Sequence, residues 1–362
     1  MSFKPNFEIT SAIAQSLMRI EAAREAVTRL PITPALLKSL RRTARLQTTH
    51  YSTMIEGNRL SEAEVREVIL HEGHFAGRER DEKEVLGFYA ALDHVEKLAG
   101  ESRRITKTDL KRIHTLVMGG GKKRVRPTPY RDGQNVIRES GTGYIVYMPP
   151  KAEDVPLLMG ELIEWTGGDD GLPSPLRAGL AHYQYATIHP YYDGNGRTAR
   201  LLATLILHRG SYDLKGIYCL EEYYARDLGA YYKAISLGPS HNYYLGRAEA
   251  DITPWLEYFC GGMADSFEAV SRNAEAEARK GADDSSALLR KLDARKRKAL
   301  ALFEAKEEIT SADVASLFGV GERAGRAICR KWAEEDFLAV RNPARRNRSY
   351  VLFNRWKNLI EN

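Results

Sequence analysis

The twelve residues from His189 to Arg200 constrain the fold of this chain more than any other stretch, and they read His-Pro-Tyr-Tyr-Asp-Gly-Asn-Gly-Arg-Thr-Ala-Arg. Directly before them, apolar residues recur at helical spacing over 175–187. A second helical pattern begins at Leu201 and continues until Gly210. The twelve residues are therefore predicted to form a tight loop that opens a buried helix.

The loop has the composition of a phosphate-binding site. Backbone N–H groups at the start of a helix lack intrahelical partners, and the helix dipole favours negative charge at that end. Gly194 and Gly196 allow a phosphate to approach the backbone closely, and Asn195 supplies a further amide between them. Arg197 and Arg200 add two permanently charged cations. The loop is thus predicted to bind a polyphosphate.

Two further residues of the loop suit group transfer. A histidine titrates near neutrality, so His189 can take a proton from an attacking hydroxyl. Asp193 provides a carboxylate that suits Mg²⁺ bound to phosphate oxygens. Together with the phosphate cradle they predict phosphoryl or nucleotidyl transfer to a hydroxyl. A simple turn would need neither the acid nor two arginines, and the sequence contains no Walker A motif or kinase glycine-rich loop.

The composition is that of an ordinary globular protein. The 362 residues are 43% hydrophobic and 28% charged, enough for two or three domains with a sizeable core. The apolar stretch 201–207 is far too short to cross a membrane, and residues 1–5 lack a signal-peptide core, so we expect a cytoplasmic protein with no membrane partner. The scattered Cys219, Cys260 and Cys329 suggest neither a disulfide framework nor a zinc site.

Helical patterns dominate the chain on both sides of the motif. Before residue 120, capping residues and apolar spacing predict helices over about 11–30, 34–57, 61–69, 82–98 and 106–117. After the motif, helices are expected over 221–237 and 253–277. The segment His71-Glu72-Gly73-His74 is one residue short of a two-histidine metal spacing, so it is interpreted as a polar helix end.

The end of the second predicted helix carries a carboxylate in an unfavourable place. Gly57 fits the left-handed position that follows a helix, so Glu56 lies in the last helical turn. A negative charge there faces the negative end of the helix dipole. Two interpretations stay open: a hydrated surface glutamate, or one that pairs with a cation from another part of the chain.

The region 130–150 breaks the helical pattern. Val136-Ile137 and the residues 144–147 are β-forming and flank Gly141-Thr142-Gly143, which predicts a β-hairpin. A lone hairpin has to pack on something. It is either a surface hairpin on the helices or an edge that receives an extended peptide by strand addition.

Four tyrosines gather after the motif, at positions Tyr223, Tyr224, Tyr231 and Tyr232. Most such aromatic residues pack in the core or between helices. A place beside a nucleotide base is the less common alternative, and the spacing alone leaves both open.

The C-terminal part differs in charge from the rest. Residues 280–362 hold 18 Lys/Arg and 12 Asp/Glu, whereas the preceding residues hold 36 of each. After a linker over 281–286, two helices over 313–318 and 322–335 and two apolar arms within 338–353 predict a winged helix-turn-helix. Basic residues on the second helix and at the wing tip suit phosphate contacts with DNA, although such domains also serve in protein interaction. These residues are Arg323, Arg326, Arg330, Lys331, Arg345, Arg346 and Arg348.

The motif also resembles that of a known family. His189 to Arg200 is similar to the Fic signature His-Pro-Phe-x-Asp/Glu-Gly-Asn-Gly-Arg-x-x-Arg, and Tyr191 in place of the phenylalanine is the one departure. The resemblance extends from about residue 35 to about residue 260. The hairpin that ends in Met148-Pro149-Pro150 looks like the family's target-docking flap, whose docking residues here would be Ile145, Val146 and Tyr147.

This resemblance implies a protein adenylyltransferase, which moves AMP from ATP to a Ser, Thr or Tyr hydroxyl of a target protein and releases pyrophosphate. His189 would deprotonate the hydroxyl, and Asp193 would hold Mg²⁺ on the α- and β-phosphates. The adenine pocket would contain Tyr231 and Tyr232. The anion hole would consist of Gly194, Asn195, Gly196 and Arg197.

The resemblance also implies control of this activity. Ser52-x-x-x-Glu56-Gly57 is similar to the family's inhibitory-helix motif, Ser/Thr-x-x-x-Glu-Gly/Asn. Glu56 would form an ion pair with Arg200 and compete with the γ-phosphate of ATP for the same guanidinium. Relatives that phosphorylate their targets depart from Gly-Asn-Gly, so the intact motif favours AMP transfer.

The expected fold is mainly α: a Fic-type helical bundle with a β-hairpin flap, followed by a winged helix-turn-helix domain. The expected domains are a helical region with the inhibitory helix over 1–100, the Fic core over 101–278 and the winged helix over 279–362.

Two other functions stay open: a DNA-binding regulator whose Fic-like domain senses nucleotide, and removal of AMP by the same site with a water oriented by Glu56. Whether the chain forms a homodimer also stays open.

Overall fold

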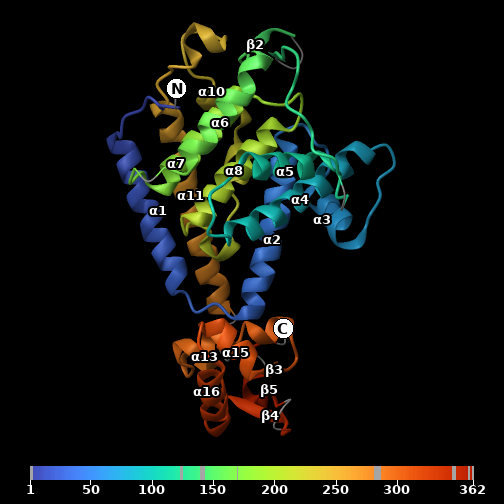
Figure 1. The fold of residues 1–362 in the computed structure, drawn as a ribbon, viewed down its shortest axis with the longest axis vertical. Coiled ribbons are helices and arrows are strands. Elements are labelled where there is room, and N and C mark those ends of the chain that lie inside the picture. The colour runs from blue at the N-terminus through green and yellow to red at the C-terminus, as the bar shows by residue number, and fades with distance from the viewer. Residues whose placement is uncertain are drawn as a thin grey trace. The chain divides into compact units, whose positions relative to one another are not determined.

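Helices make up most of the chain, which confirms the predicted mainly helical fold. The structure, a computed structural model, describes residues 3–122, 125–138, 143–168, 170–280, 287–344, 348–357 and 359–360. Contacts divide the chain into two units, labelled by element in Figure 1: unit 1 is Met1–Glu25 with Thr43–Val270, and unit 2 is Ala26–Arg42 with Ser271–Asn362. The expected domain boundaries near residues 100 and 278 stay a prediction.

Unit 1 is built from helices that lie close to the predicted ranges. Their bounds are α1 Ser11–Arg29, α2 Pro34–Met54, α3 Glu62–His71, α4 Glu79–Ala99, α5 Lys107–Met118, α6 Val155–Thr166, α7 Ser174–Ile188, α8 Asn195–Arg209, α9 Glu221–Arg226, α10 Leu228–Ile235 and α11 Thr253–Lys280, and α1, α2 and α11 also contribute residues to unit 2. Short turns η1 (Ala152–Asp154), η2 (Leu214–Gly216) and η3 (Tyr243–Arg247) lie between them. No helix in the described part of the chain is long and apolar enough to span a membrane.

Side-chain caps explain where several helices begin. Ser61 accepts a hydrogen bond from the backbone N–H of Glu64, whose carboxylate bonds back to the Ser61 N–H, and Thr106 does the same at α5. These capping boxes satisfy N–H groups that the first helical turn leaves unpaired, and each cap contributes about 1 kcal/mol. Thr310 forms a third capping box at α15 (Ser311–Phe318) of unit 2. These caps lie at the starts of helices that the sequence predicts.

The central helix of unit 1 is α8, which packs against α7, α4 and α5 (Figure 1). Leu201, Leu202 and Leu205 of α8 are fully buried, and α7 is buried along nearly its whole length. Burying one leucine side chain contributes about 2 kcal/mol. The α7–α8 pair is thus a firm support for the short loop that joins the two helices.

Two helical segments differ from the prediction. The helix expected over 221–237 is divided into α9 and α10, because Asp227 has non-helical backbone angles and its carboxylate caps α10 by accepting from the Ala230 N–H. Aspartate often ends or starts a helix in this way, since its side chain competes for backbone hydrogen bonds. The helix α6 was not singled out from the sequence, although Pro156 in its first turn is a favourable start.

The predicted hairpin is present in unit 1. Strand β1 (Ile137–Arg138) pairs antiparallel with β2 (Ile145–Tyr147). Residues 141 and 142 of the predicted turn 141–143 lie outside the described ones. Beyond β2, Met148 forms a parallel bridge with Asn242. The base of the hairpin is therefore held by the loop that leads into η3.

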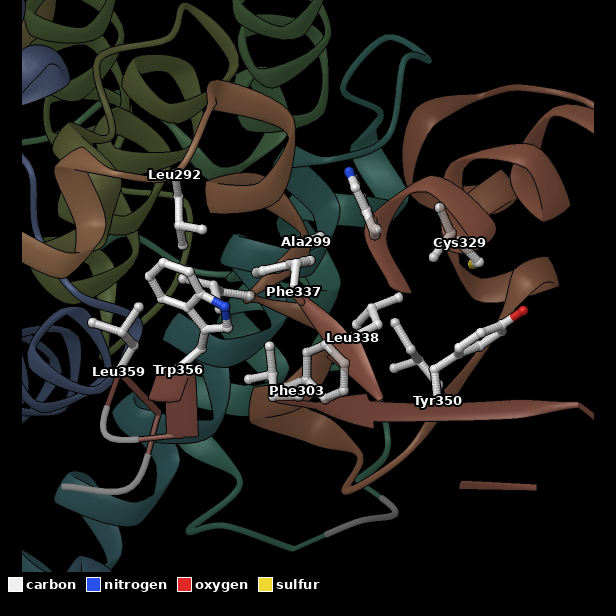
Figure 2. Close-up of a cluster of buried hydrophobic side chains, with 14 of the residues drawn as sticks. Leu292, Ala299, Phe303, Cys329, Phe337, Leu338, Tyr350, Trp356 and Leu359 are labelled. Carbon is white, nitrogen blue, oxygen red and sulfur yellow. The ribbon is translucent and has the colours of Figure 1, made fainter. Parts of the chain in front are cut away.

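Unit 2 has a small core of its own (Figure 2). Helices α15 and α16 (Glu322–Glu334) pack together beside an antiparallel sheet of order β3-β5-β4, with β3 Ile309–Thr310, β4 Leu338–Asn342 and β5 Ser349–Leu352. Short helices complete the unit: α12 Ala287–Arg290, α13 Ala294–Ala299, α14 Leu302–Ala305 and α17 Asn354–Lys357. The buried cluster includes Leu292, Ala299, Phe303, Cys329, Phe337, Leu338, Tyr350, Trp356 and Leu359.

The order of these elements, helix, turn, helix and hairpin, agrees with the pattern predicted from the sequence. The designation as a winged helix-turn-helix domain stays a prediction. The predicted linker 281–286 and the basic wing tip 345–347 lie outside the described residues.

Gly87 makes the packing of α4 on α5 testable. A Cβ atom at Gly87 would lie 2.3 Å from the carbonyl oxygen of Val117, so the two helices approach closely there. We expect Gly87→Ala to lower the free energy of unfolding by roughly 1–3 kcal/mol through overpacking. Urea denaturation of the full chain measures the change.

Gly261→Ala is the matched control for this substitution. Gly261 lies inside α11, and a Cβ atom there would meet nothing within 4 Å. Alanine should raise the stability at this position by up to about 1 kcal/mol, since it restricts the unfolded chain. If both substitutions changed stability equally, close packing at Gly87 would be refuted.

Candidate functional site

The motif forms a loop between two helix ends. Helix α7 ends at Ile188, and His189 follows in the left-handed conformation with φ 51° and ψ 60°. Gly194 is also left-handed, with φ 78°, and caps the start of α8. A side chain at Gly194 would collide with Met118 and His114. The tight loop predicted from the sequence is therefore present, with a glycine where both conformation and space require one.

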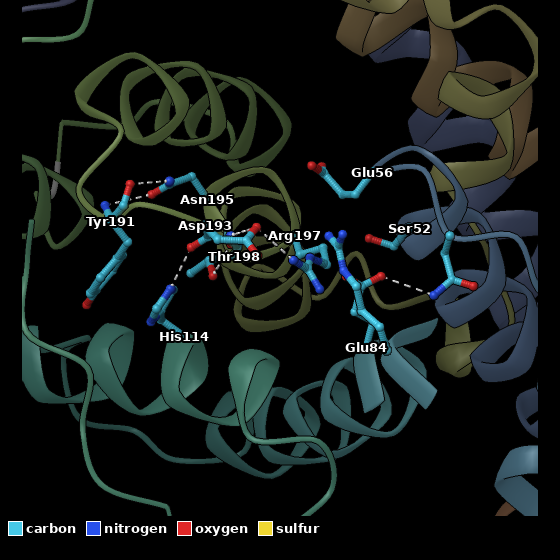
Figure 3. A network of polar contacts seen from close by, with 12 residues as sticks. Ser52, Glu56, Glu84, His114, Tyr191, Asp193, Asn195, Arg197 and Thr198 are labelled. Carbon is cyan, nitrogen blue, oxygen red and sulfur yellow. Dashed lines mark hydrogen bonds and ion pairs between the residues drawn. The ribbon is translucent and has the colours of Figure 1, made fainter. Parts of the chain in front are cut away.

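Asn195 holds the loop through its side chain (Figure 3). Its Nδ2 donates to the Tyr191 carbonyl at 2.7 Å, and its Oδ1 accepts from the Tyr191 N–H at 3.0 Å. Asn195 is 3% exposed, so both bonds are protected from water. Asn195 is one of the predicted phosphate-binding residues, and its backbone N–H is the group that remains for that role.

His114 supports the same loop from α5, although no sequence motif contains it. Its ring stacks on Tyr191 with centroids 3.5 Å apart and planes 6° from parallel. Its Nε2 donates to the Asp193 carbonyl at 2.9 Å, which requires the tautomer with hydrogen on Nε2 (Figure 3). Burial lowers the pKa of His114 to about 4, so the ring is neutral at pH 7. A lone histidine in an amphipathic helix carries no sequence signal for this contact.

Asp193 and Arg197 face each other across the first turn of α8. Arg197 Nη2 lies 3.0 Å from Asp193 Oδ1, and the Gly194 N–H donates to the same oxygen at 2.6 Å. The Asp193 side chain is 53% exposed, whereas that of Arg197 is 2% exposed. Asp193 is thus a fixed carboxylate at the mouth of the loop.

The described residues contain no group of three His, Cys, Asp or Glu side chains that could hold a metal ion together. A Mg²⁺ ion does not need such a cage, because it is commonly held by one or two carboxylates together with phosphate oxygens and water. The single accessible carboxylate of Asp193 fits that mode of binding.

Arg200 meets the end of α2. Its Nε donates to Ser52 Oγ at 2.8 Å, and its Nη2 donates to the Ser52 carbonyl at 2.8 Å and to Glu56 Oε1 at 2.9 Å. Arg200 is 2% exposed and Ser52 is fully buried. Three contacts from two residues of α2 and its terminal turn therefore engage one guanidinium.

Glu56 also covers the start of α8. A Cβ atom at Gly196 would lie 2.2 Å from Glu56 Oε1, so the carboxylate rests directly over the glycine. Gly57 has φ 91°, as predicted for the residue after the helix, although α2 itself ends at Met54. The carboxylate thus lies where an anion bound to the first turn of α8 would lie.

Two guanidinium nitrogens at this site are buried without a hydrogen-bond partner among the described residues: Nε of Arg197 and Nη1 of Arg200. A buried donor that makes no hydrogen bond costs roughly 1–3 kcal/mol. These donors are therefore available to an anion at the N-terminus of α8.

His189 places a neutral imidazole at the end of α7. Burial lowers the pKa of His189 to about 4, and the charge of Arg131 acts in the same direction. A hydrogen bond with the Ala186 backbone and the charges of Glu56 and Asp193 oppose the shift. The imidazole is therefore unprotonated at pH 7 and able to accept a proton.

The two adenine-pocket candidates have different environments. Tyr231 is buried and its hydroxyl lies 3.1 Å from His182 Nε2. Tyr232 is 47% exposed, and its hydroxyl donates to the Ile55 carbonyl at 3.0 Å, next to Glu56. Tyr232 is thus the accessible ring of the two.

The three flap candidates also differ. Ile145 and Val146 are exposed on β2, whereas Tyr147 is buried. The Tyr147 hydroxyl donates to the Thr187 carbonyl at 2.6 Å, so it fixes the hairpin to the end of α7. The structure therefore leaves Ile145 and Val146 as the side chains that could meet a partner.

Sequence comparison gives these features a context. Residues 104–207 match the profile of the Fic/DOC family. Protein adenylyltransferase Fic of Culex quinquefasciatus is 32% identical over 198 residues, which cover 54% of this chain and 38% of that protein. The protein of the same name from Aedes aegypti gives the same identity and coverage. The chain thus spans less than half the length of these curated relatives.

Solved structures agree with the predicted Fic-type fold. A Fic family protein from Desulfovibrio desulfuricans G20 superposes with a TM-score of 0.60 at 25% identity, covering 97% of this chain and 99% of that one. A Fic domain containing signaling protein from Bacteroides thetaiotaomicron gives 0.59 at 23% identity, covering 74% of this chain and 97% of that one. The predicted mainly helical, Fic-type fold is thereby confirmed, whereas the winged helix-turn-helix domain stays a prediction.

His182, which lies behind Tyr231, makes the stability of unit 1 depend on pH. Burial lowers the pKa of His182 to about 3, and the charge of Arg200 adds to this. Because an unfolded histidine binds a proton below pH of about 6.5 and the folded one does not, stability is lost as the pH falls below that value. Urea unfolding of the wild type and of His182→Phe at pH 7 and at pH 5 measures this effect. We expect the difference in the free energy of unfolding, wild type minus His182→Phe, to be about 2 kcal/mol smaller at pH 5 than at pH 7. An advantage that did not change with pH would refute the buried neutral histidine.

Proposed function

Since this chain belongs to the Fic family, we propose that it is a protein adenylyltransferase, which transfers AMP from ATP to a Ser, Thr or Tyr hydroxyl of a target protein and releases pyrophosphate. The observation that carries the proposal is the neutral His189 at the end of α7, one short loop away from the anion-binding start of α8. The curated relatives named protein adenylyltransferase Fic support the same activity.

The chemistry needs one proton transfer and one bond exchange. His189 accepts the proton of the target hydroxyl, and the hydroxyl oxygen forms a bond to the α-phosphorus of ATP. The bond between that phosphorus and the pyrophosphate oxygen breaks. The backbone N–H groups at the start of α8 and the Nε of Arg197 stabilise the negative charge on the phosphates.

Asp193 would hold Mg²⁺ at the mouth of the loop, since its half-exposed carboxylate is accessible there. The ion would supply positive charge to the α- and β-phosphates. Asp193 already accepts hydrogen bonds from Gly194 and Arg197 through one oxygen, so its orientation is fixed before any ligand arrives.

Tyr232 is the better candidate for contact with adenine, because its ring is exposed and that of Tyr231 is buried. For the target protein, the exposed Ile145 and Val146 of β2 support docking of an extended segment along the hairpin. The target hydroxyl would then be presented toward His189.

The same geometry supports self-inhibition. Arg200 would bind the γ-phosphate of ATP, and Glu56 at 2.9 Å competes for that guanidinium. The Glu56 carboxylate also lies over Gly196, where it repels an incoming phosphate. Productive binding of ATP therefore requires Glu56 to leave.

ATP labelled at either the α- or the γ-phosphate tests this function directly. We expect label to reach protein only from the α position, and Glu56→Gly to increase self-modification at least about 10-fold, the change expected when roughly 1.4 kcal/mol of competition is removed. His189→Ala in the Glu56→Gly background should abolish transfer. Transfer from the γ position would instead identify a kinase.

Glu72→Gly is the matched control for Glu56→Gly. Glu72 is also a glutamate at a helix end, it is exposed, and its left-handed φ of 54° suits glycine. This substitution should leave transfer unchanged. If Glu56→Gly were no more active than wild type while Glu72→Gly behaved as expected, the inhibitory role of Glu56 would be excluded.

DNA binding by unit 2 is a second candidate function, supported by one face of α16. Arg323, Arg326 and Arg330 are exposed at spacings of three and four residues, so they share a face opposite the buried Cys329 and Trp332. Arginines in this arrangement suit contacts with successive phosphates.

Fluorescence anisotropy with duplex DNA tests this candidate. We expect binding at 50 mM salt that weakens at least about 10-fold when Arg326→Glu and Arg330→Glu are combined, with the slope of log affinity against log salt reduced by about 2. The control combines Lys97→Glu and Lys151→Glu, two exposed cations of unit 1. No binding at low salt, or equal weakening in the control, would remove DNA as a partner.

A further inference from the structure

Arg131 lies between the hairpin and the motif loop, and no sequence pattern singled it out. It is 3% exposed. Its guanidinium donates to the carbonyls of three residues: Nε to His189 at 2.9 Å, Nη1 to the nearby Gly133 at 3.1 Å, and Nη2 to Pro150. Its backbone N–H donates to the Pro190 carbonyl at 3.0 Å.

The charge of Arg131 has no carboxylate partner within ion-pair distance among the described residues. Burial accordingly lowers the pKa of Arg131, whereas an ion pair would raise it. Burying an unpaired cation costs several kcal/mol, so space-filling alone is a poor reason for an arginine here. The planar fork of a guanidinium, in contrast, is suited to hold three acceptors in fixed directions at once.

On one side, Arg131 fixes the backbone of the candidate base. His189 adopts a left-handed conformation, which costs a non-glycine residue of order 1–3 kcal/mol unless its surroundings hold it. Arg131 binds the carbonyls of both His189 and Pro190. The direction in which the imidazole leaves the backbone therefore depends on Arg131.

On the other side, Arg131 fixes the base of the hairpin. Pro150 ends the segment that follows β2, and its carbonyl is bound by Nη2. Gln134 Nε2 also donates to the Pro149 carbonyl at 3.0 Å, which joins the two ends of the hairpin. The hairpin base and the His189 backbone thus share one buried guanidinium.

We propose that Arg131 is a positioning residue that sets the His189 imidazole relative to a hydroxyl docked on the hairpin. This inference rests on the proposed adenylyltransferase function. Arg131 acts on the transfer step and not on ATP binding, because the anion loop is held separately by His114 and Asn195. Loss of Arg131 therefore separates kcat from nucleotide affinity.

The test uses the full chain in the Glu56→Gly background with α-labelled ATP. We expect Arg131→Ala to lower kcat for labelling of the enzyme and of lysate proteins by about 100-fold, as for a misplacement of about 1 Å, with the Kd for ATP within about twofold. Millimolar guanidinium should restore part of the labelling by occupying the vacated site. Arg131→Lys should retain an intermediate kcat, since one ammonium cannot reach all three carbonyls.

Arg209→Ala is the matched control. Arg209 likewise donates to two backbone carbonyls, those of Arg103 and Leu98, and lies at the far end of α8, roughly 18 Å along the helix from Arg197. We expect it to leave kcat unchanged and guanidinium to have no effect on it. Thermal unfolding of each variant reports whether the fold persists.

Three results would overturn the inference. The first is an Arg131→Ala enzyme that is as active as its parent. The second is a loss of ATP affinity in proportion to the loss of kcat, which indicates a structural role only. If Arg131→Ala does not fold, Arg131→Lys replaces it in the test. The third contradicting result is then an Arg131→Lys enzyme in which kcat does not fall more than the affinity for ATP. An inactive Glu56→Gly parent would instead refute the proposed function itself.

Discussion

The burial of two guanidinium groups in the first turns of α8 determines much of unit 1. Arg197 and Arg200 are both almost completely buried. Burying a charge costs several kcal/mol, and a carboxylate partner with further hydrogen bonds offsets part of that cost. Asp193 therefore forms an ion pair with Arg197 within the loop, and Glu56, just after the end of α2, forms one with Arg200. The position of α2 against α8 thus follows from an electrostatic requirement as much as from apolar packing.

The loop itself is held by contacts from within it and from other elements. His114 binds the Asp193 carbonyl from α5, Asn195 closes the loop on Tyr191, and Arg131 binds the carbonyls of His189 and Pro190. Each contact uses a backbone carbonyl of the loop as acceptor, so the loop geometry exists before any ligand arrives. Fixed dipoles of this kind are effective because they need no reorganisation when charge moves.

The sequence predicted the parts of the fold that local chemistry encodes. Capping boxes at Ser61, Thr106 and Thr310 and the glycine loop at Gly194 depend on residues within a few positions of one another. The break at Asp227 was missed, because an aspartate that caps a new helix looks the same in sequence as one exposed within a longer helix.

The supports of the site were harder to predict. Local sequence around Glu56 fits a hydrated glutamate as well as an ion pair, and only the motif resemblance points to Arg200, which lies 144 positions away. His114 and Arg131 act on backbone carbonyls 79 and 58 positions away, and a carbonyl has no residue identity that a sequence pattern could reveal. Contacts of this kind become visible only when the chain is folded.

The shared use of Arg200 has a quantitative consequence for a cell. If ATP and Glu56 require the same guanidinium, the apparent dissociation constant for productive ATP binding equals the intrinsic one divided by the fraction of molecules in which Glu56 has left. The ion pair at 2.9 Å then raises the ATP concentration that is needed to occupy the site. A partner that held α2 away from α8 would lower this ATP concentration without contacting the nucleotide. By thermodynamic reciprocity, bound ATP would raise the affinity for that partner by the same factor.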